Sequence, residues 1–272
     1  MLRDYLREEK LPLFWCPGCG NGVVHQAILR NMDAHNLAPE NTVVVTGIGC
    51  WGKADDYIKT STFHGTHGRA LAFATGIKLA NPKLNVITLI GDGDGITIGG
   101  NHLIHAARRN IDLTVVMVNN LNYGMTGGQY SGTTPKHYFT KTSPYGHVEN
   151  GFDVCKMVTA AGAPFVARAT VYDVGQLYNY IGKAFEHNGF SFVEVISPCP
   201  THFGRSNNMS SATKMLTWIK EHSISIDRAA DISESELEGK FVTGIFANYI
   251  KEDYGTAYAR ICSNMKGVSA DV

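Results

Sequence analysis

The sequence has no surplus of charge, no apolar run of membrane length and no secretory leader. Its 24 basic and 24 acidic residues give a formal net charge of zero, so it lacks the basic surplus with which proteins neutralise nucleic-acid phosphates. Its apolar runs are shorter than the ~20 residues that cross a bilayer. Its first residues, MLRDYLREEKLPLFW, are charged where a signal peptide has an apolar core. We therefore expect a cytoplasmic protein that binds neither nucleic acid nor membrane.

The chain of 272 residues is long enough to bury one large α/β core. Short apolar runs alternate with helical patterns as far as residue 205; the clearest runs are TVVVT at 42–46, VITLI at 86–90, LTVVMV at 113–118 and FVEVI at 192–196. This alternation predicts a doubly wound, mostly parallel sheet. Because it fails further on, we expect one domain over residues 1–205 and a C-terminal arm over residues 206–272 that packs on this core or on a partner.

Two polar clusters follow neighbouring apolar runs, GDGDG at 91–95 and NNLNYG at 119–124. Because carboxyl ends of parallel strands meet at one edge of a sheet, one ligand can contact both clusters. Asp92 and Asn120 offer oxygens of the kind that Mg²⁺ prefers, and the glycines let backbone N–H groups approach phosphates. We interpret the pair as a site for a metal-bound diphosphate, with two ordinary polar turns as the simpler alternative. A nicotinamide site is less well supported, because Ile96 stands where G-x-G-x-x-G needs glycine.

The spacing of these clusters resembles the thiamine-diphosphate fingerprint, GDG followed after a similar gap by NN. Here 25 residues, 94–118, separate the two motifs. On this resemblance Asp92, Asn120 and the backbone carbonyl of Asn122 would hold Mg²⁺. The residues of the two motifs implied to line the cofactor are Gly91, Gly93, Asp94, Gly124, Met125 and Thr126.

Four of the six cysteines lie in turns rich in glycine or proline. They are Cys16, Cys19, Cys50 and Cys199. The last two follow predicted strands, at the edge where GDGDG is expected. In a reducing compartment such cysteines are metal ligands, catalytic groups or unrelated buried core residues before they are disulfides. Four thiolates suit zinc or a 4Fe–4S cluster, and spacing alone leaves both open. We expect the other two, Cys155 and Cys262, in the core, because they lie in apolar helical patterns.

No glutamate lies between Glu40 and Glu149, although every motif of the expected diphosphate site falls in that span. Thiamine enzymes need a carboxylic acid, usually glutamate, against the aminopyrimidine ring, after which the cofactor performs the chemistry. We therefore expect the acid to come from another chain, so that this chain carries half of a site at a subunit interface. The alternative is that a later glutamate, such as Glu194, folds back.

Other polar residues near these motifs have less specific patterns. His67, in HGTHGR, is a candidate phosphate donor and catalytic group, with a capping or core role equally open. His102 and His105 have i,i+3 spacing but no evident third ligand, so we expect helix residues near the site. Residues 129–150 form too long a stretch for a passive connection, which predicts a loop over the site or at an interface.

Six segments together resemble the β subunit of 2-oxoacid:ferredoxin oxidoreductases, the 2-oxoglutarate type most closely. They are WCPGCGNG at 15–22, GIGCWGK at 47–53, THGRALAFATGIKLANP at 66–82, GDGDGITIGGNHLIHAARRNIDLTVVMVNN at 91–120, YGMTGGQYSGTTP at 123–135 and FVEVISPCPTHFGR at 192–205. The resemblance implies oxidative decarboxylation of a 2-oxoacid, foremost 2-oxoglutarate, to CO₂ and an acyl-CoA such as succinyl-CoA. It also implies that electrons leave through a 4Fe–4S cluster to ferredoxin, and that the reaction is reversible in principle.

The same resemblance implies where the cofactors bind. Cys16, Cys19, Cys50 and Cys199 would ligate the 4Fe–4S cluster. Further residues implied to line thiamine diphosphate are Ile48, Gly49, Cys50, Trp51, His67 and Gly68. A separate α subunit would complete the site and help to bind coenzyme A and the oxoacid, and the number of further subunits is left open. The chain has no flavin, nicotinamide or ferredoxin-type motif, so onward electron transfer needs another protein.

Two positions depart from many relatives and leave the substrate open. Trp51 stands where a small residue is common, and Gly127 or Gly128 stands where some relatives have lysine. Pyruvate and branched or aromatic 2-oxoacids are therefore alternatives to 2-oxoglutarate. Lys53, the basic residue nearest the Cys50 turn, is a candidate to face a substrate carboxylate, or is a solvated lysine. Two other functions stay open: a non-redox thiamine enzyme subunit with structural zinc, and a zinc-stabilised, non-catalytic interaction subunit.

Overall fold

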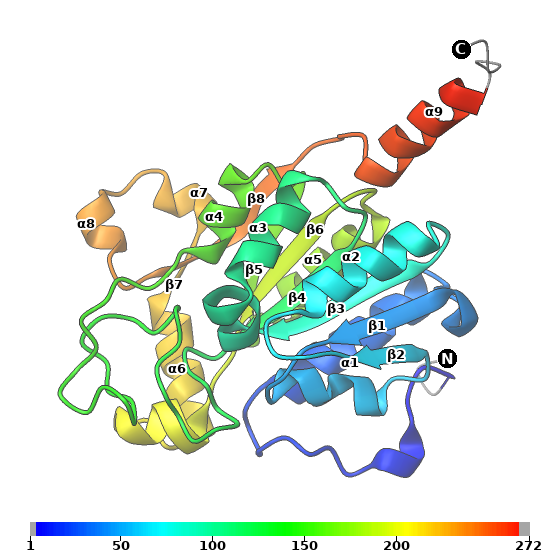
Figure 1. The fold of residues 1–272 in the computed structure, drawn as a ribbon. Coiled ribbons are helices and arrows are strands. Elements are labelled where there is room, and N and C mark those ends of the chain that lie inside the picture. The colour runs from blue at the N-terminus through cyan, green and yellow to red at the C-terminus, as the bar shows by residue number, and fades with distance from the viewer. Residues whose placement is uncertain (1–3, 267–272) are drawn as a thin grey trace.

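The computed structural model describes residues 4–266, built around one eight-stranded sheet with the order β2–β1–β3–β4–β6–β5–β8–β7 (Figure 1). The strands are β1 (Thr42–Thr46), β2 (Ser61–His64), β3 (Asn85–Gly91), β4 (Thr114–Asn119), β5 (Phe165–Thr170), β6 (Ser191–Ile196), β7 (Ser223–Ser225) and β8 (Phe241–Asn248). Strands β1 to β6 pair in parallel, and β8 runs antiparallel to β5. The predicted doubly wound, mostly parallel α/β sheet is confirmed.

Helices cover both faces of the sheet, which is why its central strands are mostly apolar on both sides. One core lies between the strands and α1 (Asn21–Ala34) with α5 (Val174–Glu186). A second core lies on the opposite face, under α2 (Ala70–Ala80), α3 (Gly100–Arg108) and α4 (Val154–Ala160) (Figure 1). All residues of β5 and β6 are buried between these two layers. No helix within residues 4–266 has the length and apolar character needed to cross a membrane.

The strand order places a ligand crevice between β1 and β3. Strand β1 has β2 on one side and β3 on the other, so the connections leaving β1 and β3 diverge at their carboxyl ends. Short helical turns follow both strands, at Trp51–Tyr57 and Gly93–Ile98. The GIGC and GDGDG segments therefore meet at this edge, as the sequence predicted.

The C-terminal segment returns to the sheet before it leaves the core. After α6 (Ala212–His222), the short helices α7 (Ile226–Ala229) and α8 (Glu234–Leu237) lead to β8, which pairs with β5. Strand β8 thus belongs to the same sheet as the core strands. The final helix, α9 (Tyr254–Lys266), projects from the sheet (Figure 1) and leaves Tyr258, Ile261 and Met265 between 56 and 67% exposed.

The two cysteines expected in the core differ in their surroundings. Cys155, on α4, is fully buried, as predicted. Cys262 is only partly buried, so the prediction of a core position for it is wrong. Its helical apolar pattern is real, but α9 lies outside the core and has no second layer to bury that face.

An ion pair is buried where β5 and β6 meet. Arg168 Nε donates to Glu194 Oε2 over 2.7 Å, and the two side chains are 6% and 1% exposed. The guanidinium also donates to Asp153 Oδ1 over 2.5 Å and to the backbone oxygen of Val242 over 3.0 Å. Buried charges are tolerated only when they are paired and hydrogen-bonded in this way.

We expect Arg168→Met to lower the free energy of unfolding by about 3–5 kcal/mol, because it leaves the Glu194 carboxylate buried without its cation. Denaturant unfolding of the purified protein measures this loss. Arg260→Met is the matched control, since the Arg260–Glu252 pair, at 2.9 Å, is largely exposed and its loss should cost less than about 1 kcal/mol. Equal losses in the two variants would contradict the prediction.

Candidate functional site

A cavity at the carboxyl edge of the sheet lies between the turns that follow β1, β3 and β4. Every residue that the sequence predicted to line the cofactor forms part of its wall, except Gly68 and Gly93. Asp92, Asn120 and Asn122 line it too, and so does Tyr123, which sequence reasoning missed. Gly93 lies behind the Tyr123 ring, where an added Cβ would fall 2.3 Å from a ring carbon. The cavity therefore gathers the two predicted motifs around one space.

The three residues expected to bind Mg²⁺ come together. One terminal atom of the Asn120 amide lies 2.6 Å from the backbone oxygen of Asn122 and 3.3 Å from Asp92 Oδ1. When this atom is nitrogen, it donates to both oxygens. When it is oxygen, three oxygens surround one point, which is the donor set of a hard divalent cation. The residues therefore fit Mg²⁺ when the Asn120 amide presents its oxygen to this point.

The Asp92 carboxylate is held from behind by two hydroxyls that the sequence did not single out. Its Oδ2 accepts from Ser131 Oγ over 2.5 Å and from Thr133 Oγ1 over 2.7 Å. Burial raises the pKa of Asp92 to about 6, although both hydroxyls oppose this shift. A cation next to the carboxylate would favour its charged form. The Ser- and Thr-rich composition of residues 129–150 was the only signal for these contacts.

Asp94 organises the cavity walls. Its Oδ1 accepts from Gly68 N over 2.7 Å, from His67 Nδ1 over 2.6 Å and from Ile48 N over 3.2 Å. The carboxylate thereby joins the turns after β1 and β2 to the turn after β3. Because Nδ1 of His67 is engaged, Nε2 is the ring nitrogen left for a ligand. Gly47 permits the arrangement, since an added Cβ would lie 2.0 Å from Asp94 Oδ2.

The four turn cysteines gather beside this cavity. A Cβ added to Gly124 would lie 3.6 Å from Cys50 Sγ and 3.7 Å from Cys199 Sγ. Ser197 Oγ donates to the backbone oxygen of Cys19 over 2.7 Å, which joins the N-terminal CPGC turn to the turn after β6. Segments separated by most of the chain thus bring their thiols to one place.

Cys19, Cys50 and Cys199 are partly or fully buried, whereas Cys16 is exposed. Burial raises the pKa of Cys19 to about 11 and that of Cys50 to about 12, with smaller contributions from Cys16 and Cys199. Among residues 4–266, no three His, Cys, Asp or Glu side chains lie close enough to share a single metal ion. Zinc would need all four sulfurs at about 2.3 Å. The four thiols offer soft donors for a metal cofactor, and their positions leave zinc and a 4Fe–4S cluster both open.

Two other expectations concern residues at the edge of this site. Lys53 Nζ lies 2.6 Å from Asp56 Oδ2, and Lys53 does not line the cavity. Trp51 lines the cavity, but it is 2% exposed and its Nε1 donates to the backbone oxygen of Val116 over 3.2 Å. Most of the Trp51 ring therefore packs in the core, next to Trp15.

The alternative that Glu194 folds back into the site is wrong, because its carboxylate is paired with Arg168 inside the sheet. No glutamate of the described chain lines the cavity. His102 and His105 lie on α3, so the expectation that they are helix residues is confirmed.

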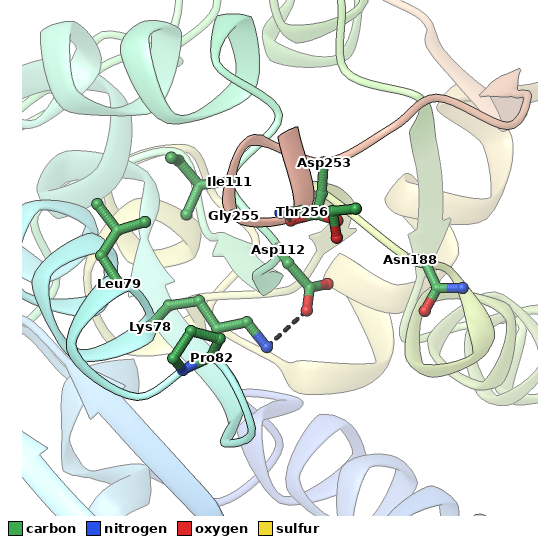
Figure 2. Close-up of a pocket in the computed structure, with 9 residues that line it drawn as sticks. All are labelled: Lys78, Leu79, Pro82, Ile111, Asp112, Asn188, Asp253, Gly255 and Thr256. Carbon is green, nitrogen blue, oxygen red and sulfur yellow. Dashed lines mark hydrogen bonds and ion pairs between the residues drawn. The ribbon is translucent and has the colours of Figure 1, made fainter. Parts of the chain in front are cut away.

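A larger cavity lies at the opposite edge of the sheet, under the start of α9 (Figure 2). Its walls come from segments that precede strands, including Lys78, Pro82, Asp112 and Asn188. Lys78 Nζ and Asp112 Oδ2 are 2.6 Å apart, so its main charged groups satisfy each other. It contains none of the residues singled out by the sequence, and we do not assign the candidate site to it.

Comparisons with known proteins agree with this geometry. Residues 44–195 match the family model of the thiamine pyrophosphate enzyme C-terminal TPP binding domain. The chain is 49% identical over 244 residues to 2-oxoglutarate synthase subunit KorB of Methanothermobacter thermautotrophicus, covering 90% of this chain and 85% of that relative. It is 46% identical over 262 residues to subunit KorB of Methanocaldococcus jannaschii, covering 96% and 97%. A similar solved structure is 2-oxoglutarate:ferredoxin oxidoreductase from Magnetococcus marinus, with 2-oxoglutarate, coenzyme A and succinyl-CoA bound. The TM-score is 0.86 and the sequence identity 32%, and the match covers 99% of this chain and 92% of that chain.

Proposed function

Because this chain belongs to the family of 2-oxoacid:ferredoxin oxidoreductase β subunits, we propose that it works with an α subunit to oxidise 2-oxoglutarate to succinyl-CoA and CO₂. The family and the thiamine-diphosphate-binding fold expected from the sequence are confirmed. The choice of 2-oxoglutarate is supported by the names of the similar subunits and by the ligands of the similar structure. One observation carries the proposal: the Asp92 carboxylate, the Asn120 amide and the Asn122 carbonyl lie together, beside the sulfurs of Cys50 and Cys199.

In the proposed enzyme, each part of the site has its own task. Asp92, Asn120 and the carbonyl of Asn122 would hold Mg²⁺ and thereby the diphosphate. His67, oriented by Asp94, would offer Nε2 to the same phosphates. When bound, thiamine diphosphate supplies a carbanion able to add to a 2-oxoacid and promote its decarboxylation. Cys16, Cys19, Cys50 and Cys199 would hold the 4Fe–4S cluster that takes up the electrons for ferredoxin.

The proposal assigns the missing acid to the partner subunit. The cavity wall contains Asp92 and Asp94, and both carboxylates are already engaged by neighbouring donors. The acid that activates the aminopyrimidine ring therefore has no candidate in the described part of this chain. We assign it to the α subunit, together with part of the site for coenzyme A and the oxoacid.

We expect turnover only when the chain is purified anaerobically with its partner subunits. The complex should contain thiamine diphosphate, magnesium, iron and sulfide, and should reduce ferredoxin fastest with 2-oxoglutarate and coenzyme A. Cofactor analysis and a panel of 2-oxoacids measure both properties. The chain purified alone is the control and should show no turnover.

Each alternative has its own outcome in this experiment. Full turnover by the chain alone would contradict the assignment of the acid to a partner. A colourless, zinc-containing complex would favour the non-redox thiamine enzyme, and a complex without thiamine diphosphate would favour a non-catalytic subunit. Faster turnover of pyruvate or of a branched 2-oxoacid would change the substrate assignment.

A further inference from the structure

We propose that Asn119 and Thr133 are positioning residues, which set the affinity for Mg²⁺ by holding its three protein ligands in place. Neither residue is expected to contact the metal. The inference rests on the proposed function, because it concerns how tightly the same site holds Mg²⁺ and the diphosphate. Its basis is a chain of buried hydrogen bonds that runs from the Arg168–Glu194 ion pair to Asp92.

The Glu194 carboxylate sets the orientation of the Asn119 amide. Asn119 is 3% exposed, and its Nδ2 donates to Glu194 Oε1 over 2.8 Å. An ionised carboxylate only accepts hydrogen bonds, so the amide nitrogen has to face it. Arg168 holds the same carboxylate from its other side. The Asn119 oxygen is therefore committed to the opposite direction, toward the Asn119–Asn122 turn.

That oxygen stabilises a strained turn which carries two of the three metal ligands. Asn119 Oδ1 accepts from Leu121 N over 3.1 Å. Leu121 has a φ of 65°, a left-handed conformation that is unfavourable for a residue with a Cβ. The turn places the Asn120 side chain and the Asn122 carbonyl together. Without the hydrogen bond to Asn119, the turn loses the contact that offsets its strain.

Thr133 connects this turn to the third ligand. Its Oγ1 lies 2.9 Å from Asn119 Oδ1 and 2.7 Å from Asp92 Oδ2. Thr133 is 5% exposed, and the single proton of its hydroxyl is shared between these two acceptors. The Thr133 side chain therefore connects Asp92, on the turn after β3, with the turn after β4 that carries Asn120 and Asn122. Three oxygens from two separate turns are held near one point, and pre-organisation of this kind raises affinity without a new contact to the ligand.

The test measures Mg²⁺-dependent retention of thiamine diphosphate by the purified complex with its partner subunits. We expect Asn119→Ala to raise the Mg²⁺ concentration for half-maximal retention at least tenfold, and Thr133→Val to raise it severalfold. Thr133→Ser, which keeps the hydroxyl, should restore the wild-type value. At saturating Mg²⁺ the variants should regain most of their kcat, because the inferred defect is in metal affinity.

Asn31→Ala is the matched control. Asn31 is also buried, at 1% exposure, and its Nδ2 donates to the backbone oxygens of Ala27 and Tyr178, remote from the site. This variant should lose thermal stability without any change in Mg²⁺ dependence. An equal shift in Asn31→Ala, or unchanged Mg²⁺ dependence in Thr133→Val, overturns the inference. Because Thr133→Val removes no volume, it provides the decisive measurement even where Asn119→Ala fails to fold. A wild-type complex that retains no thiamine diphosphate at any Mg²⁺ concentration would instead overturn the proposed function.

Discussion

Asp92→Asn is expected to abolish retention of thiamine diphosphate and to lower turnover by a factor on the order of 10³ or more, equivalent to about 4 kcal/mol. Asp92 is the only carboxylate among the three proposed metal ligands. Asparagine keeps the shape of the side chain and can still bond to Ser131 and Thr133, but it removes the negative charge that attracts Mg²⁺. Cofactor analysis and steady-state turnover of the complex with its partner subunits measure the two effects.

The same substitution should not destabilise the protein in the absence of metal. Burial raises the pKa of Asp92 to about 6, above its ordinary value near 3.9. The folded chain therefore holds this proton more tightly than the unfolded chain does. Stability should fall as pH rises between these two values, and the ionised carboxylate is unfavourable above them. A neutral asparagine removes that cost, so we expect the cofactor to be lost while thermal stability is maintained or increased.

The control for this prediction is Asp112→Asn. Asp112 pairs with Lys78 in the cavity at the opposite edge of the sheet (Figure 2). Its substitution should therefore leave the thiamine diphosphate content unchanged. Wild-type thiamine diphosphate content in Asp92→Asn would contradict the assignment of Asp92 as a metal ligand. If Asp92→Asn loses the cofactor because the protein itself unfolds at a lower temperature, the prediction of maintained thermal stability is wrong.

Cys199→Ser should remove the cluster and with it the reduction of ferredoxin. Cys199 is 8% exposed and faces the same space as Cys50. Loss of a supporting residue costs a metal site about 10- to 100-fold in affinity or activity, and loss of a direct ligand should cost more. Iron content and the visible absorption of the anaerobic complex measure the cluster, and ferredoxin reduction measures its use.

Cys262→Ser is the matched control, since Cys262 lies on α9, outside the core. It should keep wild-type iron content, colour and turnover. Full iron content in Cys199→Ser would remove this residue from the proposed ligand set. Zinc in place of iron in the wild-type complex would reject the cluster and favour the non-redox alternative.

The sheet and the location of the site could be predicted from the sequence because both depend on local patterns. Apolar runs of strand length alternate with helical periodicity, and this alternation specifies a parallel sheet with helices on both faces. Parallel strands end at one edge, so the polar clusters after β3 and β4 had to meet. Cys50 and Cys199 follow β1 and β6, and they reach the same edge for the same reason.

Other contacts depend on residues far apart in the chain, and no local pattern indicates them. Asp94 lines the predicted cavity, and the sequence did not indicate that its Oδ1 joins Ile48, His67 and Gly68. Cys262 has the spacing of a core helix residue, but α9 packs outside the core. In both cases the packing between distant elements, and not the local pattern, decides the surroundings of the side chain.

The sequence by itself determined the α/β class, the edge that carries the site and the residue types gathered there, because spacing along a strand or turn encodes these features. Only the tertiary structure decided how the GDG–NN site is supported. Ser131 and Thr133 hold Asp92, and Glu194 orients Asn119, through hydrogen bonds that bridge separate turns and strands. Such bonds require close packing of distant segments, and burial makes any unmatched polar group costly. The geometry of the proposed metal ligands is therefore a property of the folded core.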